Sequence, residues 1–552
     1  MESTMQEVPL TLTELLRRGH RLFGDSEVVT NQGERSRHTS FAGVAARVAR
    51  LAGGLRELGV RADDRVATLC WNHQEHLEAY FAVPCMGAVL HTLNLRLPPH
   101  QLAQIVNHAG DRVIIVDASL APLLAAIRPH LSTVETVIVV GDGEHTAALG
   151  ETMRYDDVLA RGADHFEWPR LDERSAAAMC YTTGTTGDPK GVVYSHRSMY
   201  LHALAVWGAF QLSDSDRTLV IVPMFHVNAW GVPYVAWMLG ADMLLPDRFL
   251  QPDGLCSFIQ RERPTFTGGV PTIFTGMLAY AESTGADVSS LKRAVCGGSA
   301  VPASLITAFR EKLGIELIQA WGMTETSPIG TIAYPPRGAS PEDEMKYRAK
   351  TGRAVPGVEL RIVDDDGNEV SSDGVAVGEI EVRGPWITGS YFNATAPEKF
   401  DGGWLRTGDV GSMDALGYVQ ITDRSKDVIK SGGEWISSVE LENLLMGHPA
   451  IADAAVVGVA DEKWQERPLA AVVLKPGASA TPDELRAYLG DSVVRWWVPE
   501  RWAFVSEIPK TSVGKQDKKR IRAEYAAGNI AVVQVPATGA PSSERPVAGR
   551  SG

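Results

Sequence analysis

The most constraining feature of this sequence is a glycine- and threonine-rich stretch at residues 181–191. Its three glycines lack Cβ atoms, so backbone N–H groups there can approach a polyphosphate closely. Threonine hydroxyls add hydrogen-bond donors, and the lysine adds a mobile positive charge. The apolar run at 176–180 predicts a buried strand, so the stretch predicts a phosphate-binding loop at a strand end. The candidate contacts are Thr182, Thr183, Gly184, Thr185, Thr186, Gly187 and Lys190.

This loop differs from the Walker A loop of many nucleotide-binding proteins. Gly191 follows Lys190, where a Walker A loop carries the Ser or Thr that binds magnesium. The pattern instead resembles the phosphate loop of the adenylate-forming enzymes, which include acyl-CoA synthetases, luciferases and peptide-synthetase adenylation domains. Taken alone, the stretch is also compatible with a surface loop that binds nothing, so the rest of the chain must agree.

Length, charge and cysteine content limit the class of protein. A chain of 552 residues is longer than one hydrophobic core usually organises, so at least two domains are expected. A net charge of −14 disfavours a nucleic-acid partner and requires local positive charge at any site for ATP. The five cysteines lie scattered in mostly apolar runs, which predicts reduced core thiols. No signal peptide opens the chain, so a cytoplasmic location is expected.

One uncharged segment is long enough to be tested against a membrane span. Residues 218–241 contain no Asp, Glu, Lys or Arg. Pro223 and Pro233 would break a helix there, and polar and glycine residues interrupt the apolar run. The segment therefore predicts strand, loop and helix within a core rather than a transmembrane helix.

Apolar periodicity predicts an α/β fold. Helices are expected over 10–18, 40–58, 76–86 and 101–110, and strands over 65–70, 112–116, 134–140, 292–295 and 315–319. This alternation predicts a large N-terminal domain of parallel sheets with helices on both faces, whose ligands gather at the carboxyl ends of the strands. Short strands at 358–363, 378–383 and 418–421, between glycine-rich turns, predict a small antiparallel β subdomain.

A small α+β domain is expected to follow. Helices are predicted over 438–446 and 482–489, and strands over 451–459, 469–474 and 503–505. The resemblance implies an adenylation domain at 1–423, a hinge at 424–427 and a mobile C-terminal domain at 428–530, and the irregular composition of 531–552 predicts a disordered tail.

A second motif, residues 320–327, agrees with the phosphate loop. After a predicted strand it presents an aromatic ring, a hydroxyl and a carboxylate within five residues, which suits nucleotide stacking, phosphate contact and metal coordination. By resemblance to the adenylate-forming family, Trp321 packs on adenine, Thr324 contacts the α-phosphate and Glu325 helps to hold Mg²⁺. Gly322 and Met323 join the nucleotide site on the same basis.

Two further strand ends supply candidates, one for an acid pocket and one for the nucleotide. A strand is expected to end at Pro223 and to lead into an aromatic turn before a helix. His226, Val227 and Trp230 in that turn suit an acid with a hydrophobic tail, although core packing explains any one of them as well. After residue 296, two adjacent glycines would let a flat ring lie on the backbone, which makes Gly298, Ser299 and Ala300 nucleotide candidates.

The remaining candidates rest mainly on the resemblance. Asp409 is expected as an exposed carboxylate in a turn, where the resemblance implies that it accepts both ribose hydroxyls; without the other motifs, a turn cap would be the preferred explanation of this aspartate. The resemblance adds Ile421, places Arg424 on the ribose and makes Lys426 the hinge. Further candidates implied by it are Gly432 and Gly433, which line the thiol tunnel, and Lys515, which neutralises charge at the α-phosphate. Without it, Lys515 is one more lysine in a basic run.

The resemblance covers residues 10–525, with its motifs in the family's order, and looks most like bacterial medium- to long-chain fatty acyl-CoA synthetases. It implies two steps: ATP with Mg²⁺ activates a carboxylic acid to acyl-AMP, and CoA then takes the acyl group. It is compatible with a homodimer and with peripheral contact with a membrane, and the sequence decides neither. Alternatives left open are an aromatic acid, a carrier protein, amine or nitrite as nucleophile, and an inactive binding protein.

Overall fold

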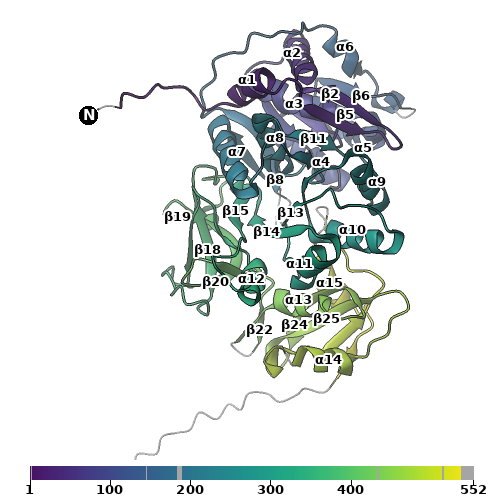
Figure 1. The fold of residues 1–552 in the computed structure, drawn as a ribbon, viewed down its shortest axis with the longest axis vertical. Helices are drawn as coiled ribbons and strands as arrows, with labels where there is room; N and C mark the ends of the chain where they lie inside the picture. The colour runs from purple at the N-terminus through teal and green to yellow at the C-terminus, as the bar shows by residue number, and fades with distance from the viewer. Residues whose placement is uncertain are drawn as a thin grey trace, which may run out of the picture. The chain divides into compact units, whose positions relative to one another are not determined.

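The computed structural model describes residues 1, 3–143, 146–182, 189–424, 426–431, 434–490, 492–511 and 515–535 (Figure 1). The chain divides into two compact units. The larger contains residues 1–301, 305–407 and 413–420, and the smaller contains 302–304, 408–412 and the chain from 421 onward.

The first sheet of the larger unit carries the phosphate loop. Its neighbouring strands are parallel except for the last pair, β8 and β9, which is antiparallel. In spatial order the strands are β7 (Met153–Arg154), β6 (Thr136–Val140), β5 (Asp111–Asp117), β3 (Arg65–Leu69), β4 (Val89–Thr92), β8 (Ala176–Thr182) and β9 (Lys190–Ser195).

A second sheet of nine strands holds the other motifs of the larger unit. Its centre is parallel, and antiparallel strands close both edges. In spatial order the strands are β16 (Arg353–Ala354), β15 (Ile329–Ile332), β14 (Glu316–Gly322), β13 (Arg293–Cys296), β12 (Phe266–Gly269), β10 (Arg217–Leu219), β11 (Asp242–Leu245), β1 (Glu27–Asn31) and β2 (Ser36–Ser40).

Helices packed on these sheets follow from sequence periodicity. In α2 the apolar residues recur at helical spacing and are fully buried, and the Ser40 hydroxyl caps its first turn by accepting from Gly43 N at 3.1 Å. The helices before residue 350 are α1 (Leu12–Leu22), α2 (Phe41–Glu57), α3 (Gln74–Cys85), α4 (Pro99–Ala109), α5 (Ala121–Ile127), α6 (Tyr155–Leu159), α7 (His196–Phe210), α8 (Val232–Leu239), α9 (Pro252–Glu262), α10 (Pro271–Thr284), α11 (Ala303–Ala308) and α12 (Pro341–Arg348).

The two smaller sheets confirm the antiparallel subdomain and the α+β module. The antiparallel sheet has the order β17 (Glu359–Val363), β18 (Gly378–Arg383), β20 (Trp404–Met413) and β19 (Phe400–Asp401), and β21 (Val419–Arg424) pairs with β20. The last sheet runs β23 (Glu434–Ile436), β22 (Ile429–Ser431), β25 (Gln465–Leu474), β26 (Arg501–Phe504) and β27 (Val533–Gln534), and β24 (Ile451–Asp461) pairs with β25. Its helices are α13 (Ser438–Met446), α14 (Pro482–Gly490) and α15 (Lys518–Ala526).

Several predicted boundaries were wrong, and local hydrogen bonds explain the clearest case. The strand expected to end at Pro223 ends at Leu219. Beyond it, the Asn72 amide donates to Val220 O and Val222 O, both at 2.8 Å, so a side chain replaces a neighbouring strand. In the expected tail, residues 533–534 form β27 on β26, and residues 536–552 lie outside the described part.

The predictions for the cysteines and for the uncharged segment were confirmed. All five cysteines are buried free thiols. Residues 218–241 form the end of β10, a turn and α8, as expected for strand, loop and helix. In the described part of the chain, no helix combines the length and the apolar character that crossing a bilayer requires.

Candidate active site

The phosphate loop connects the two strands of a hairpin. The last residue of β8, Thr182, pairs with the first residue of β9, Lys190, in antiparallel register. The Lys190 side chain is one-third exposed, and its ammonium lies 3.6 Å from a carboxylate oxygen of Glu398. The other loop candidates, Thr183, Gly184, Thr185, Thr186 and Gly187, lie outside the described residues.

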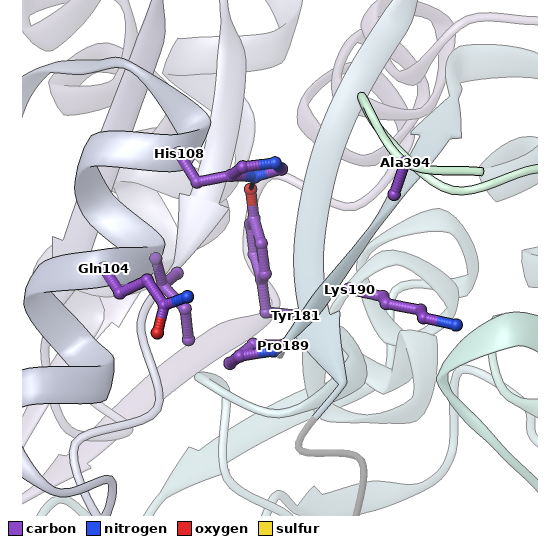
Figure 2. Close-up of a pocket in the computed structure, with 7 residues that line it drawn as sticks. Gln104, His108, Tyr181, Pro189, Lys190 and Ala394 are labelled. Carbon is purple, nitrogen blue, oxygen red and sulfur yellow. Dashed lines mark hydrogen bonds between the residues drawn. The ribbon is translucent and has the colours of Figure 1, made fainter. Parts of the chain in front are cut away.

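A cavity of about 340 Å³ lies beside the loop end of this hairpin (Figure 2). The Tyr181 hydroxyl and His108 Nδ1 lie 2.6 Å apart in its wall. Burial raises the pKa of Tyr181, so its hydroxyl stays protonated. Figure 2 shows the Lys190 side chain extending away from this pair. The lining residues are Gln104, Ile105, His108, Tyr181, Pro189, Lys190 and Ala394.

The turn that carries Thr324 and Glu325 follows β14 and is almost fully buried. Tyr194, on β9, donates its hydroxyl to Thr324 O at 2.8 Å. Thr388 N donates to Glu325 O, also at 2.8 Å. The turn is therefore fixed both by the strand that follows the phosphate loop and by the chain near residue 388.

Tyr391 joins two of the predicted site residues, although sequence reasoning did not find it. Its hydroxyl donates to Glu325 Oε1 at 2.8 Å, and the Lys190 ammonium lies 5.0 Å from its ring centroid. Burial raises the pKa of Tyr391, which keeps the hydroxyl protonated as a donor. No local motif marks this tyrosine, because its partners are 66 and 201 positions away in sequence.

The Glu325 carboxylate is suited to a magnesium ion that arrives with a nucleotide. Tyr391 uses Oε1, and a carboxylate oxygen is the hard ligand that Mg²⁺ prefers. Within the described residues, no group of three or more His, Cys, Asp or Glu side chains could hold a metal ion.

Trp321 lies on the last part of β14, which extends beyond the strand end predicted at residue 319. A Cβ added to Gly330, on the neighbouring β15, would come within 2.5 Å of the Trp321 ring. Glycine at 330 therefore makes room for the indole against the backbone of β15. In the next turn, Met323 N donates to the Thr326 hydroxyl at 2.9 Å and keeps the chain compact.

The predicted acid pocket contains an unusual left-handed turn. Residues 227–231 all have positive φ, between 44° and 73°, and four of the five are not glycine. Such backbone costs about 1–2 kcal/mol for each non-glycine residue, so surrounding contacts must hold it. One contact is made by the Cys180 thiol, which donates to Asn228 Oδ1 at 3.3 Å.

This turn lays the Trp230 ring over two strand ends of the nine-stranded sheet. Cβ atoms added at Gly268 and Gly297 would lie 3.6 and 3.5 Å from the indole. Trp230 is 9% exposed, and Val227 is buried, whereas His226 is half-buried. Beyond Gly297, Gly298 has φ of +86°, Ser299 is exposed and Ala300 is half-buried.

The structure corrects the expected setting of Asp409. It lies within β20 rather than in a turn, and it is 7% exposed rather than open to solvent. The cause is the period of two in a strand, which puts Asp409 on the same buried face as Leu405 and Thr407. Its carboxylate lies 3.4 Å from Arg424 Nε, on β21, so the two predicted ribose contacts are together. Ile421 is half-buried on the same strand.

The other candidates of the smaller unit are Lys426, Gly432, Gly433 and Lys515. Lys426 is exposed between β21 and β22, and Gly432 and Gly433 lie outside the described residues. The Lys515 carbonyl accepts from Thr511 N at 2.6 Å. Two nearby lysines of the basic run form ion pairs: Lys510 with Asp453 at 2.6 Å, and Lys518 with Glu442 at 2.8 Å.

Comparison with protein families agrees with this arrangement over most of the chain. A model described as "AMP-binding enzyme" matches residues 16–392, and one described as "AMP-binding enzyme C-terminal domain" matches residues 440–515. This chain belongs to the AMP-binding enzyme family. The resemblance drawn from the two motifs and the ribose residues is thereby confirmed, together with the mixed α/β fold.

Individual relatives extend over nearly the full length of this AMP-binding enzyme. A long-chain-fatty-acid–CoA ligase of Thermus thermophilus is 48% identical over 95% of this chain and 97% of its own. A medium-chain-fatty-acid–CoA ligase of Ectopseudomonas oleovorans is 41% identical over 95% and 98%. A solved anthranilate CoA ligase in complex with anthranoyl-AMP has a TM-score of 0.86, 28% identity, and coverage of 95% of this chain and all of its own.

Proposed function

We propose that this protein is an AMP-forming acyl-CoA synthetase that activates a medium- or long-chain fatty acid. The acid and ATP give acyl-AMP and pyrophosphate, and CoA then gives acyl-CoA and AMP. The observation that carries the proposal is identity of 41–48%, over 95% of the chain, to ligases for medium- and long-chain fatty acids. The proposal is also supported by the apolar turn around Trp230, because such a surface suits the hydrophobic tail of a fatty acid.

For the first step, we assign each residue a role that matches its chemistry. Lys190 and the loop threonines hold the β- and γ-phosphates, and Thr324 and Lys515 hold the α-phosphate. Trp321 and the 298–300 backbone pack against adenine, while Asp409 accepts from the ribose hydroxyls beside Arg424, which donates. A magnesium ion on Glu325 would offset the negative charge of the phosphates. Charge stabilisation at fixed positions then accounts for most of the catalysis.

For the second step, we propose that the C-terminal domain turns about Lys426. Lys515 would leave the α-phosphate, and Gly432 and Gly433 would line the path of the CoA thiol. The thiolate would attack the acyl carbonyl carbon and AMP would depart. One hinge with two working positions explains why a lysine so late in the sequence serves a loop near its start.

The decisive experiment measures release of pyrophosphate and AMP with saturated acids from acetate to palmitate, with and without CoA. We expect CoA-dependent AMP formation with one range of chain lengths. Pyrophosphate release without stimulation by CoA would contradict the assigned nucleophile, and absence of turnover with every fatty acid would contradict the assigned acid.

A second acid class must be included in this panel. A 3-methylmercaptopropionyl-CoA ligase of Ruegeria pomeroyi is 45% identical over 95% of this chain. Its name specifies a short thioether acid, and its similarity lies between those of the two fatty-acid ligases. Turnover of 3-methylmercaptopropionate in preference to octanoate or palmitate would select this candidate, and aryl acids complete the panel.

We further propose that the enzyme forms a homodimer and makes peripheral contact with membranes that supply fatty acid. Support comes from Leu204 and Trp207 on α7, which are 37% and 47% exposed although both are large and apolar. Sedimentation velocity tests the dimer, and co-sedimentation with phosphatidylglycerol vesicles tests the membrane contact. A monomer that stays in the supernatant would contradict both proposals.

A further inference from the structure

The charged residues assigned to the phosphates and to magnesium both contact one tyrosine, one at its ring face and the other at its hydroxyl. Tyr391 donates to Glu325 Oε1 through its hydroxyl at 2.8 Å, and the Lys190 ammonium lies over its ring at 5.0 Å from the centroid. Tyr391 is 6% exposed, so both contacts are made in a largely dehydrated setting. The ring also packs against Phe400, with 5.7 Å between ring centroids.

The backbone around Tyr391 is anchored to both halves of the site. Phe392 N donates to Gly191 O at 2.8 Å, immediately after the phosphate hairpin begins its second strand. Thr388 N donates to Glu325 O at 2.8 Å, and Trp386 Nε1 donates to Ile329 O at 3.0 Å. The segment 386–392 is thus attached to the strand of Lys190 and to the turn of Glu325, which leaves the tyrosine little freedom to move.

We infer that Tyr391 is a positioning residue that keeps the Lys190 ammonium and the Glu325 carboxylate apart while it orients each of them. If the ammonium and the carboxylate paired directly, each would neutralise the other, and neither would then be available to ATP and its metal ion. Tyr391 satisfies one carboxylate oxygen with a neutral donor and gives the ammonium a ring face. Lys190 instead makes its ion pair with Glu398, whose side chain is 66% exposed.

This inference rests on the proposed function, because it assigns Lys190 to phosphate and Glu325 to magnesium. In this assignment, Tyr391 contacts neither the carboxylate of the acid nor the α-phosphorus of ATP. Its removal should therefore change how the two charged groups bind, rather than abolish a chemical step. The two contacts can be separated, since phenylalanine keeps the ring and loses only the hydroxyl.

The test is a calorimetric titration of the full-length protein with ATP, once in EDTA and once over a range of magnesium concentrations. For Tyr391→Phe, we expect half-saturation with magnesium to require about 10-fold more ion, because a hydrogen bond to a charged group is lost. ATP affinity in EDTA should stay within about 2-fold of wild type, since the ring still faces Lys190. Tyr391→Leu should lower the affinity in EDTA as well, by about 2- to 5-fold.

Tyr194→Phe is the matched control, because Tyr194 also donates a buried hydroxyl to this turn, but to the Thr324 backbone carbonyl. It should leave the magnesium requirement within about 2-fold of wild type. An unchanged magnesium requirement in Tyr391→Phe would overturn the inference, as would an equal shift in Tyr194→Phe. These binding results decide the inference even if the wild type turns over no fatty acid, an outcome that would overturn the proposed function alone.

Discussion

Replacing Trp230 by alanine should lengthen the acid that the enzyme prefers. The indole is 9% exposed and lies against the backbone at Gly268 and Gly297, so its removal opens space between two strand ends. Each additional methylene buried in that space contributes about 0.8 kcal/mol, which is about a 4-fold gain in kcat/KM. Two additional methylenes therefore correspond to about 1.6 kcal/mol and about a 15-fold gain for the longer acid.

The assay is pyrophosphate release at saturating CoA with a series of saturated acids, together with the KM for ATP. We expect the optimum of the series to move to longer acids, while the ATP KM changes by less than about 2-fold. Truncation of a buried tryptophan costs about 3–5 kcal/mol of folding stability, so the comparison must be made well below the melting temperature.

Trp237→Phe is the control for general loosening of the core. Trp237 is fully buried, stacks on Phe41 at 4.2 Å between ring centroids, and donates to Leu16 O at 3.1 Å. The Trp237→Phe variant should lose folding stability without any change in the chain length of the preferred acid. A Trp230→Ala enzyme that keeps its acid preference and changes only its ATP KM would refute the assignment of Trp230 to the pocket.

Three further predictions concern charge, domain rotation and pH. Lys515→Ala should reduce adenylation by at least about 100-fold, because charge at the α-phosphate is no longer offset, while thioester formation from supplied acyl-AMP largely persists; equal loss in both half-reactions would contradict the role of Lys515. Lys426→Pro should let acyl-AMP accumulate without thioester, as seen by quenched chromatography, and normal turnover would remove Lys426 from the hinge. Burial lowers the pKa of His202 to about 3, and its Nε2 accepts from Ile329 N at 3.2 Å. Because that pKa lies below the unfolded value of about 6.5, the stabilisation is complete above pH 6.5 and falls as the pH drops toward 3. Between pH 7 and pH 5 this lowers the free energy of unfolding by about 2 kcal/mol. In His202→Gln, urea unfolding should therefore show a decrease between these two pH values that is smaller by about 2 kcal/mol, and an unchanged pH dependence would contradict the prediction.

Sequence reasoning succeeded where one segment carries its own physical signal. A helix was predicted over 40–58 from apolar spacing and is observed at Phe41–Glu57, and β18 was predicted at its observed bounds. It failed where a distant side chain decides the outcome. The Asn72 amide takes the carbonyls that a longer β10 would have offered to a neighbouring strand, and the apolar composition of 220–223 gives no sign of this.

The site shows the same difference between what local sequence predicts and what distant contacts decide. The sequence alone determined the family, the α/β architecture and the candidate residues, because glycine and threonine spacing, strand ends and motif order are local properties of the chain. The tertiary structure decided that Asp409 is buried beside Arg424, that a left-handed turn lays Trp230 over two glycines, and that Tyr391 contacts both Lys190 and Glu325. These facts depend on which strands become neighbours, and the pairing of strands far apart in sequence is settled only when the whole core packs.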